Sequence, residues 1–188
     1  MRFSASVVLS GLLAANALAI PTTLKKRGVL TKQTYARFQI SDGVAGNAQA
    51  EVLQKFPVRL LKLIKKKNHD FITILTSLQI NMNDLANVAP EDQKIISDAR
   101  KVAESAETDA FNPAIEAASG AAATALQNGK IKNKVLKLQL EVMDLMISQA
   151  RGSDNAAKIT EEQTKLNNNI ATDKKNAGAT SQSVAFNG

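Results

Sequence analysis

The chain has 188 residues, a formal net charge of +7, and neither cysteine nor tryptophan. The lack of cysteine excludes disulfides, thiolate metal sites and cysteine nucleophiles, so a domain of this length must depend on a hydrophobic core alone. Aromatic residues make up only 4% of the chain. That low content argues against the stacking platforms with which proteins bind sugars or single-stranded nucleic acid.

The first 19 residues follow the pattern of a secretory signal peptide. Arg2 supplies a positive charge, a short apolar run follows, and Ala17-Leu18-Ala19 offers small residues where a signal peptidase recognises its substrate. The apolar run is too short to span a membrane. We therefore expect residues 1–19 to be removed after Ala19; a buried N-terminal helix is the alternative that fits this pattern less well.

A dibasic pair, Lys26-Arg27, ends a proline-containing stretch at residues 20–27. Kexin-like proteases of the eukaryotic secretory pathway cut after such pairs, so we expect a pro-segment at 20–27 and a mature chain that begins at Gly28. An ordinary solvated charge run is the alternative. The residues before Gly28 carry four positive charges and no negative one, which leaves +3 on the remainder. This smaller charge removes much of the support for a nucleic-acid partner.

The rest of the chain is rich in helix-forming residues, and its glycines and prolines fall mostly between periodic segments. The strongest apolar stripe lies in residues 130–151, where it repeats at spacings of four and three. Short connections favour antiparallel neighbours. The predicted fold class is therefore all-α, a small antiparallel helical bundle over residues 28–175, followed by a flexible, disordered tail at 176–188. We expect its helices at 34–40, 44–56, 114–126 and 130–151, with others starting at Pro90 and Asp154.

Several helix boundaries are marked by capping residues, prolines and glycines. Asn112 is placed to cap a helix that Pro113 opens, because proline at the first position loses no needed N–H group. Asn128-Gly129 is expected to end that helix, since glycine is common just past a helix C-terminus. Asp154 is expected to cap the last helix.

Residues 59–83 differ from their surroundings, because lysine, asparagine, isoleucine and leucine dominate and alanine is absent. One interpretation is a core helix with a solvated basic end. A second is a basic amphipathic helix in peripheral contact with anionic membranes, which is less favoured because Asn68-His69-Asp70 interrupts its apolar face. The third is a translated intron, since Val58-Arg59 can be encoded by GTAAG and Ile74-Leu75-Thr76 by a branch-point-like CTAAC. The core-helix and intron interpretations stay open.

Three runs of sequence resemble a known family. They are residues 38–48 (FQISDGVAGNA), 103–113 (AESAETDAFNP) and 128–136 (NGKIKNKVL). Through them the chain resembles an ascomycete small secreted protein family of uncharacterised function, over most of its length after Thr31. The resemblance implies secretion from a fungus and alanine-rich helices without cysteine. It implies no catalytic residues. Residues 59–83 depart from the family pattern, which continues into a short loop at this point.

The sequence offers no candidate catalytic, cofactor-binding or metal site. The patterns HExxH, GxSxG, P-loop and EF-hand are all absent, and the single histidine, His69, has no triad partner or ligand cluster nearby. Glu104 and Glu107 share an expected helix face, but solvated carboxylates are a simpler interpretation than a glycosidase pair. We therefore expect that the protein is not an enzyme and that it binds no cofactor.

These observations predict a secreted, extracellular, noncatalytic protein that acts through its surface at the fungal exterior. Its expected partner is a cell-wall component or, for an effector-like role, a host component. The alternative is an extracellular carrier of lipid or a small apolar ligand, because a helical bundle can open a cavity between its helices. Neither a nucleic-acid partner nor an integral membrane span is expected.

Overall fold

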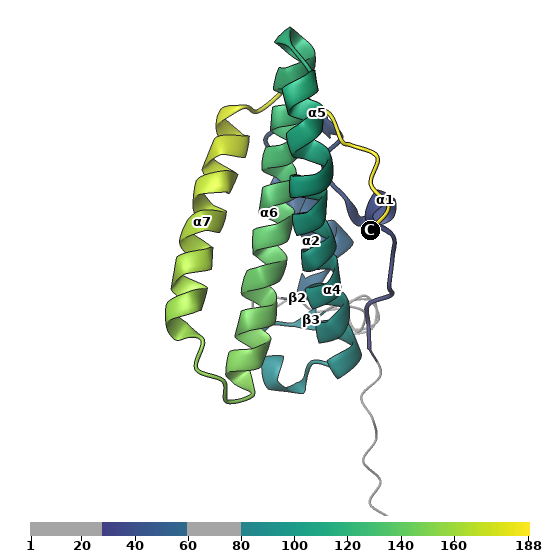
Figure 1. Cartoon of the computed structure of the whole chain (residues 1–188). Coiled ribbons are helices and arrows are strands. Elements are labelled where there is room, and N and C mark those ends of the chain that lie inside the picture. Colours follow the sequence, from purple (N-terminus) through teal and green to yellow (C-terminus); the bar gives the residue numbers. More distant parts are fainter. Residues whose placement is uncertain (1–27, 60–79) are drawn as a thin grey trace, which may run out of the picture.

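The computed structural model describes residues 28–59 and 80–188, and its elements are labelled as in Figure 1. The expected signal peptide, the pro-segment with its processing residues Ala19, Lys26 and Arg27, and most of the 59–83 stretch lie outside the described residues. The described chain is mostly helical, which confirms the predicted fold class at that level. Its elements are α1 (Tyr35–Phe38), β1 (Gly43–Val44), α2 (Ala48–Lys55), β2 (Val58–Arg59), β3 (Ile80–Asn81), η1 (Leu85–Asn87), α4 (Pro90–Ala106), η2 (Glu107–Phe111), α5 (Asn112–Ala117), α6 (Gly120–Ala150), α7 (Ala156–Lys175) and β4 (Thr180–Ser181).

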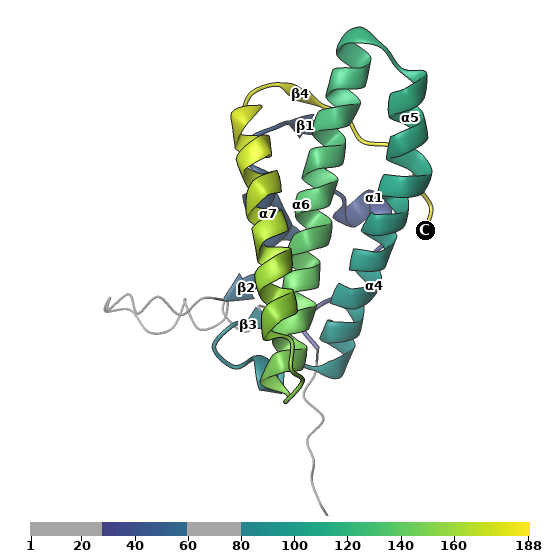
Figure 2. The same ribbon diagram turned by 60° about the vertical axis from the view of Figure 1, so that its left-hand side comes forward.

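The three long helices lie side by side with α6 in the middle, flanked by α4 and α7 (Figures 1 and 2). The central position of α6 follows from its sequence, because its apolar residues cover more than one face and can meet two neighbours. The predicted stripe of α6 is confirmed as core. Its most deeply buried members are Val135, Leu136, Leu140, Met143 and Ile147, each no more than 1% exposed.

One helical run extends from Pro90 through α4, η2 and α5 to Ala117. The start at Pro90 was predicted, but the helix does not restart at Asn112, which lies inside the run. Pro113 lacks an N–H group, and its ring crowds the carbonyl four residues back. The π-helical turn η2 precedes Pro113, and such turns accommodate a break in the usual helical bonding.

The prediction of a single helix at 114–126 is wrong, because the chain reverses direction at residues 118–119, inside that range. Residues Ala118 and Ser119 adopt extended backbone, and α6 begins at Gly120 with a positive φ of 58°. Asn128-Gly129 therefore lies within α6 and does not end a helix. At Gly129 another chain segment comes close: a Cβ added there would lie 1.9 Å from the carbonyl oxygen of Gln182. Glycine serves here to admit a neighbouring backbone.

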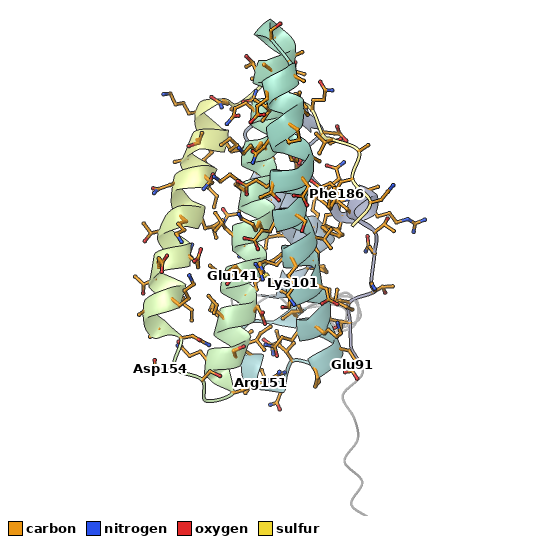
Figure 3. All side chains as sticks on the ribbon, in the orientation of Figure 1. Glu91, Lys101, Glu141, Arg151, Asp154 and Phe186 are labelled. Carbon is orange, nitrogen blue, oxygen red and sulfur yellow. The ribbon has the colours of Figure 1, made fainter. Side chains whose placement is uncertain are left out.

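The segment 176–188 does not form the flexible tail predicted from its composition. Strand β4 pairs antiparallel with β1, in the register Gly43 with Ser181. The N–H of Gln182 donates to Ala125 O on α6 at 3.0 Å, and the ring of Phe186 packs edge-on against Tyr35, beside α1 (Figure 3). Polar composition misled the prediction because this segment is held mainly by its backbone hydrogen bonds.

The N-terminal elements are shorter than expected. Helix α1 covers four residues within the predicted 34–40, and the predicted 44–56 helix is divided into β1, a loop and α2. That loop is fixed by a distant side chain. Asp173 on α7 accepts hydrogen bonds from the N–H groups of Gly46 and Ala48, both at 2.9 Å. At the other end of α7, Asn155 takes the cap position that Asp154 was expected to fill.

Candidate ligand-binding cleft

A cleft of about 510 Å³ opens beside α4, between residues 29–33 and the end of α2. Its volume falls within the range of ordinary small-molecule sites, about 300–1,000 Å³. Two described regions that are far apart in the sequence form most of it, namely the stretch from Val29 to Pro57 and the middle of α4; Gly188 also lines it.

Apolar side chains form the inner wall of the cleft. Phe38 and Phe56 are almost fully buried and pack edge-to-face with ring centroids 5.9 Å apart. Ile95 and Val102 on α4 are half-buried and belong to the same apolar layer. These four residues and the half-buried pair Val29 and Leu30 give the cleft an interior suited to an apolar group.

The charged residues that line the cleft are mainly basic. They are Lys32, Lys55 and Lys101, all exposed, with Asp98 as the one acidic side chain among the lining residues described. Asp98 is itself held by a cation, because Lys94 donates a 2.6 Å hydrogen bond to it. This hydrogen bond, with the charges of Lys94, Lys101 and Lys32, lowers the pKa of Asp98 below its usual value. An anionic group at the mouth of the cleft would therefore meet excess positive charge.

Asp92 fixes the N-terminal wall of the cleft. Its carboxylate is 2% exposed and accepts hydrogen bonds from Val29 N, at 2.9 Å to each oxygen, and from Leu30 N at 2.7 Å. Asp92 lies in the first turn of α4, where the helix dipole favours a negative charge. The wall is thus attached to α4 by a carboxylate and two backbone amides.

The carboxylates singled out in the sequence lie elsewhere, in ion pairs. Glu104 pairs with Arg100, which also reaches Glu141 on α6 at 3.0 Å. Glu107 pairs with Lys137 at 2.7 Å. Burial alone would raise the pKa of Glu107, but the hydrogen bond from Lys137 and the charge of nearby lysines hold it below its usual value. Glu104 and Glu107 are therefore engaged with basic partners along the long helices.

The remaining sequence expectations concern His69, metal sites and membrane-spanning helices. His69 lies outside the described residues. Within 28–59 and 80–188, no group of three or more histidine, aspartate or glutamate side chains is arranged to hold a metal ion. No helix in those same ranges is both long and apolar enough to cross a bilayer.

None of the cleft residues was singled out from the sequence. Phe38, Phe56 and Val102 carry no motif, and their proximity depends on how residues 29–57 cross α4. The one available signal was the helix expected to start at Pro90, whose apolar residues Ile95 and Val102 had no partner assigned to them.

The comparisons with known proteins give one match. A family model described as a domain of unknown function (DUF8454) matches residues 30–185. No curated protein and no solved structure matches the chain.

Proposed function

We propose, from the premise that this chain belongs to the DUF8454 family of domains of unknown function, that it is a noncatalytic, secreted, antiparallel helical bundle that binds a small amphiphile. The ligand has an apolar body and an anionic head group, as a free fatty acid does. The observation that carries this proposal is the 510 Å³ cleft with its apolar interior and lysine-bearing mouth.

The two parts of the ligand match two parts of the cleft. The apolar body is removed from water against Phe38, Phe56 and Val102, which contributes about 25 cal/mol for each Å² of apolar surface buried. The head group lies near Lys32 and Lys101, which are long enough to keep their ammonium groups in water while binding an anion. Because the lysines are exposed, we expect them to favour anionic ligands and to act less strongly at high salt.

The proposed place of action is the exterior of a fungal cell. The support for this is the signal-peptide pattern that ends at Ala19, the dibasic pair at Arg27 and the resemblance in residues 38–48. A surface interaction with a cell-wall or host component was favoured by the sequence. With the cleft in view, we favour carriage of an apolar ligand over this surface interaction. A defined concave site gives specific residues a binding role, whereas a general surface interaction does not.

A binding titration tests the proposal. The full chain is secreted from a yeast host, stripped of bound lipid, and titrated with a dansyl-labelled fatty acid while its fluorescence is recorded. Val102→Asp, which places a charge on the apolar wall, is expected to weaken binding at least about tenfold, because burying an unpaired carboxylate opposes the bound state. The matched control is Val44→Asp, since Val44 is 51% exposed on β1 and away from the cleft.

The lysines are tested by charge reversal. Lys101→Glu, at the residue labelled on α4 in Figure 3, is expected to weaken binding of the fatty acid but not binding of the corresponding neutral alcohol. Lys174→Glu, on α7, makes the same change in net charge without changing a cleft residue. The proposal fails if the wild-type chain shows no saturable binding, or if Val102→Asp binds as the wild type does.

A further inference from the structure

We propose that Asp92 is the binding site for a new N-terminus: the α-ammonium group that cleavage after Arg27 would create on Gly28 forms an ion pair with the Asp92 carboxylate. Proteolytic processing would then lock the N-terminal segment against α4. This inference concerns residues 28–30 and α4 and does not depend on the proposed ligand.

Asp92 is a buried carboxylate with no cationic partner among the residues that the structure describes. It is 2% exposed, and its hydrogen bonds come from the uncharged N–H groups of Val29 and Leu30. Within the described part of the chain, no lysine or arginine forms a salt bridge with Asp92, whereas Glu104, Glu107 and Glu162 each have one or more. A buried charge is unfavourable unless it is paired. The position therefore suits a positive group.

Gly28 is close enough to supply that group. A Cβ built on Gly28 would lie 2.8 Å from Asp92 Oδ1. The Cβ position and the nitrogen are two of the tetrahedral substituents of the same Cα, so a rotation of about 120° about the Cα–C bond carries the nitrogen into the Cβ position while Val29 stays in place. A free nitrogen at Gly28 can thus come to ion-pair distance of Asp92. Glycine allows this rotation, and any side chain at residue 28 would crowd the carboxylate.

Cleavage supplies the charge. A dibasic-specific endoprotease adds water to the carbonyl carbon of Arg27, and the bond between that carbon and the nitrogen of Gly28 breaks. Arg27 keeps the new carboxylate and leaves with residues 20–27. The released amine of Gly28 takes up a proton and becomes an ammonium group, because an α-amino group has a pKa of about 7.7–8.0. Before cleavage the same nitrogen is an uncharged amide that remains tethered to Arg27.

The pH dependence of stability tests the inference. The full chain is secreted from a yeast host, either as wild type or as the uncut double variant Lys26→Gln with Arg27→Gln, and each N-terminus is identified by mass. An ammonium paired with Asp92 has a higher pKa in the folded state than in the unfolded state. The extra stability is therefore complete below about pH 7.7 and is lost as the pH rises through the higher folded value.

We expect the cut protein to melt at least about 3 °C above the uncut variant near neutral pH, with the difference vanishing at alkaline pH. Asp92→Asn is expected to abolish the difference, since its single amide oxygen can still accept from Val29 N and Leu30 N, as Oδ1 does, but the side chain carries no charge. Acetylation of the Gly28 amine in the cut wild type is expected to reproduce the uncut melting curve, which provides a second test if Asp92→Asn does not fold.

The reactivity of the amine gives an independent measurement. In the cut wild type, acylation of the Gly28 amine by a limiting amount of reagent is expected to be at least about tenfold slower than in the peptide Gly-Val-Leu, because the paired ammonium must first lose a proton. Equal melting curves for cut and uncut protein, or acylation as fast as in the peptide, would overturn the inference. So would a secreted wild type that retains residues 20–27.

Discussion

The Nζ atom of Lys132, whose side chain on α6 is completely buried, lies 2.9 Å from Oε2 of Glu51 on α2. The same ammonium group donates hydrogen bonds to the carbonyl oxygens of Asp42 at 2.8 Å and Val44 at 3.1 Å. A buried lysine is tolerated when each of its donors has a partner, as here. Lys132 thus connects α6 to α2 and to the loop around β1.

We expect Lys132→Met to lower the free energy of unfolding by about 3 kcal/mol. Methionine fills a similar volume but leaves the Asp42 and Val44 carbonyls and the half-buried Glu51 carboxylate without their donor. Denaturant unfolding followed by circular dichroism measures the change. The control is Lys94→Met, because the Lys94 side chain is 74% exposed and its pair with Asp98 contributes little. Equal losses in the two variants would contradict the role assigned to Lys132.

Asp173→Ala should also destabilise the protein, by about 2 kcal/mol. The Asp173 carboxylate is 2% exposed and satisfies the N–H groups of Gly46 and Ala48 at the start of α2, which is what a side-chain cap does within a single helix. Asp154→Ala, at the expected but unused cap of α7, should have a much smaller effect in the same unfolding experiment. A larger loss from Asp154→Ala than from Asp173→Ala would show that the local cap dominates after all.

Gly129→Ala separates helix propensity from chain packing. Alanine in the middle of α6 should favour the helix by about 1 kcal/mol, yet its Cβ would clash with Gln182 O and displace the segment that carries β4. We expect a net loss of stability and faster proteolysis after residue 176. In a chain truncated after Asn176 the clash with Gln182 is absent and only a 3.2 Å contact with the Phe111 ring remains, so the same substitution should be much less destabilising. A stabilising effect in the full chain would contradict the close approach of Gln182.

The ionisation of Tyr35 can be followed alone, because it is the only tyrosine and the chain lacks tryptophan. Burial raises the pKa of Tyr35 to about 12, and its hydroxyl donates to Asn133 Oδ1 at 2.8 Å. Below about pH 10 the hydroxyl is protonated in both states; between about pH 10 and 12 only the unfolded chain loses the proton. Stability is therefore expected to fall by about 1.4 kcal/mol per pH unit in this range.

Near-ultraviolet absorbance of the phenolate measures the titration, and unfolding at the same pH values measures the stability. Tyr35→Phe removes the ionising hydroxyl, so this part of the alkaline loss should disappear in that variant. A phenolate midpoint near pH 10 in the folded protein would show that the ring is open to water.

Residue Ile80 bears on whether residues 59–83 belong to the natural protein. Strands β2 and β3 pair Val58 with Ile80, and Ile80 is 2% exposed within the core. Ile80 lies in a strand and not in the helix that the core-helix interpretation expects, so the choice between that interpretation and a translated intron stays a prediction. Ile80→Ala is expected to cost about 2–4 kcal/mol through the cavity that it leaves. Intact-mass and peptide mapping of the protein from its native organism provide the direct test. A product without residues 59–83 would show that they are a translated intron, and a product that retains them would exclude it.

The parts of the fold that depend on local chemistry were predictable from the sequence. Pro90 located the start of α4, and the apolar stripe in residues 130–151 located the second half of α6, because a helix start and an amphipathic period are set by neighbouring residues. Gly129 was misassigned because a glycine that ends a helix and a glycine that admits another chain segment look alike in the sequence.

The candidate cleft and the Asp92 site were not predictable in this way. Both depend on residues 28–57 lying against α4, and nothing in the composition of either segment identifies the other. Asp92 itself resembles any acid in a first helical turn, where the helix dipole alone explains its presence. Its bonds to Val29 and Leu30 arise only after the tertiary fold has formed.

The pairing of Gly43 with Ser181 also sets the order in which this protein can finish folding. Contacts that join distant parts of a chain form late, because a long loop must close before they gain any stability. During synthesis β4 leaves the ribosome after all the helices described above. The pairing of β1 with β4 and the contact of Tyr35 with Phe186 can therefore form only after residues 181 and 186 have been made. The native state is thus completed only after translation of the whole domain, and a chain exported during synthesis would still be incompletely folded while it crosses the membrane.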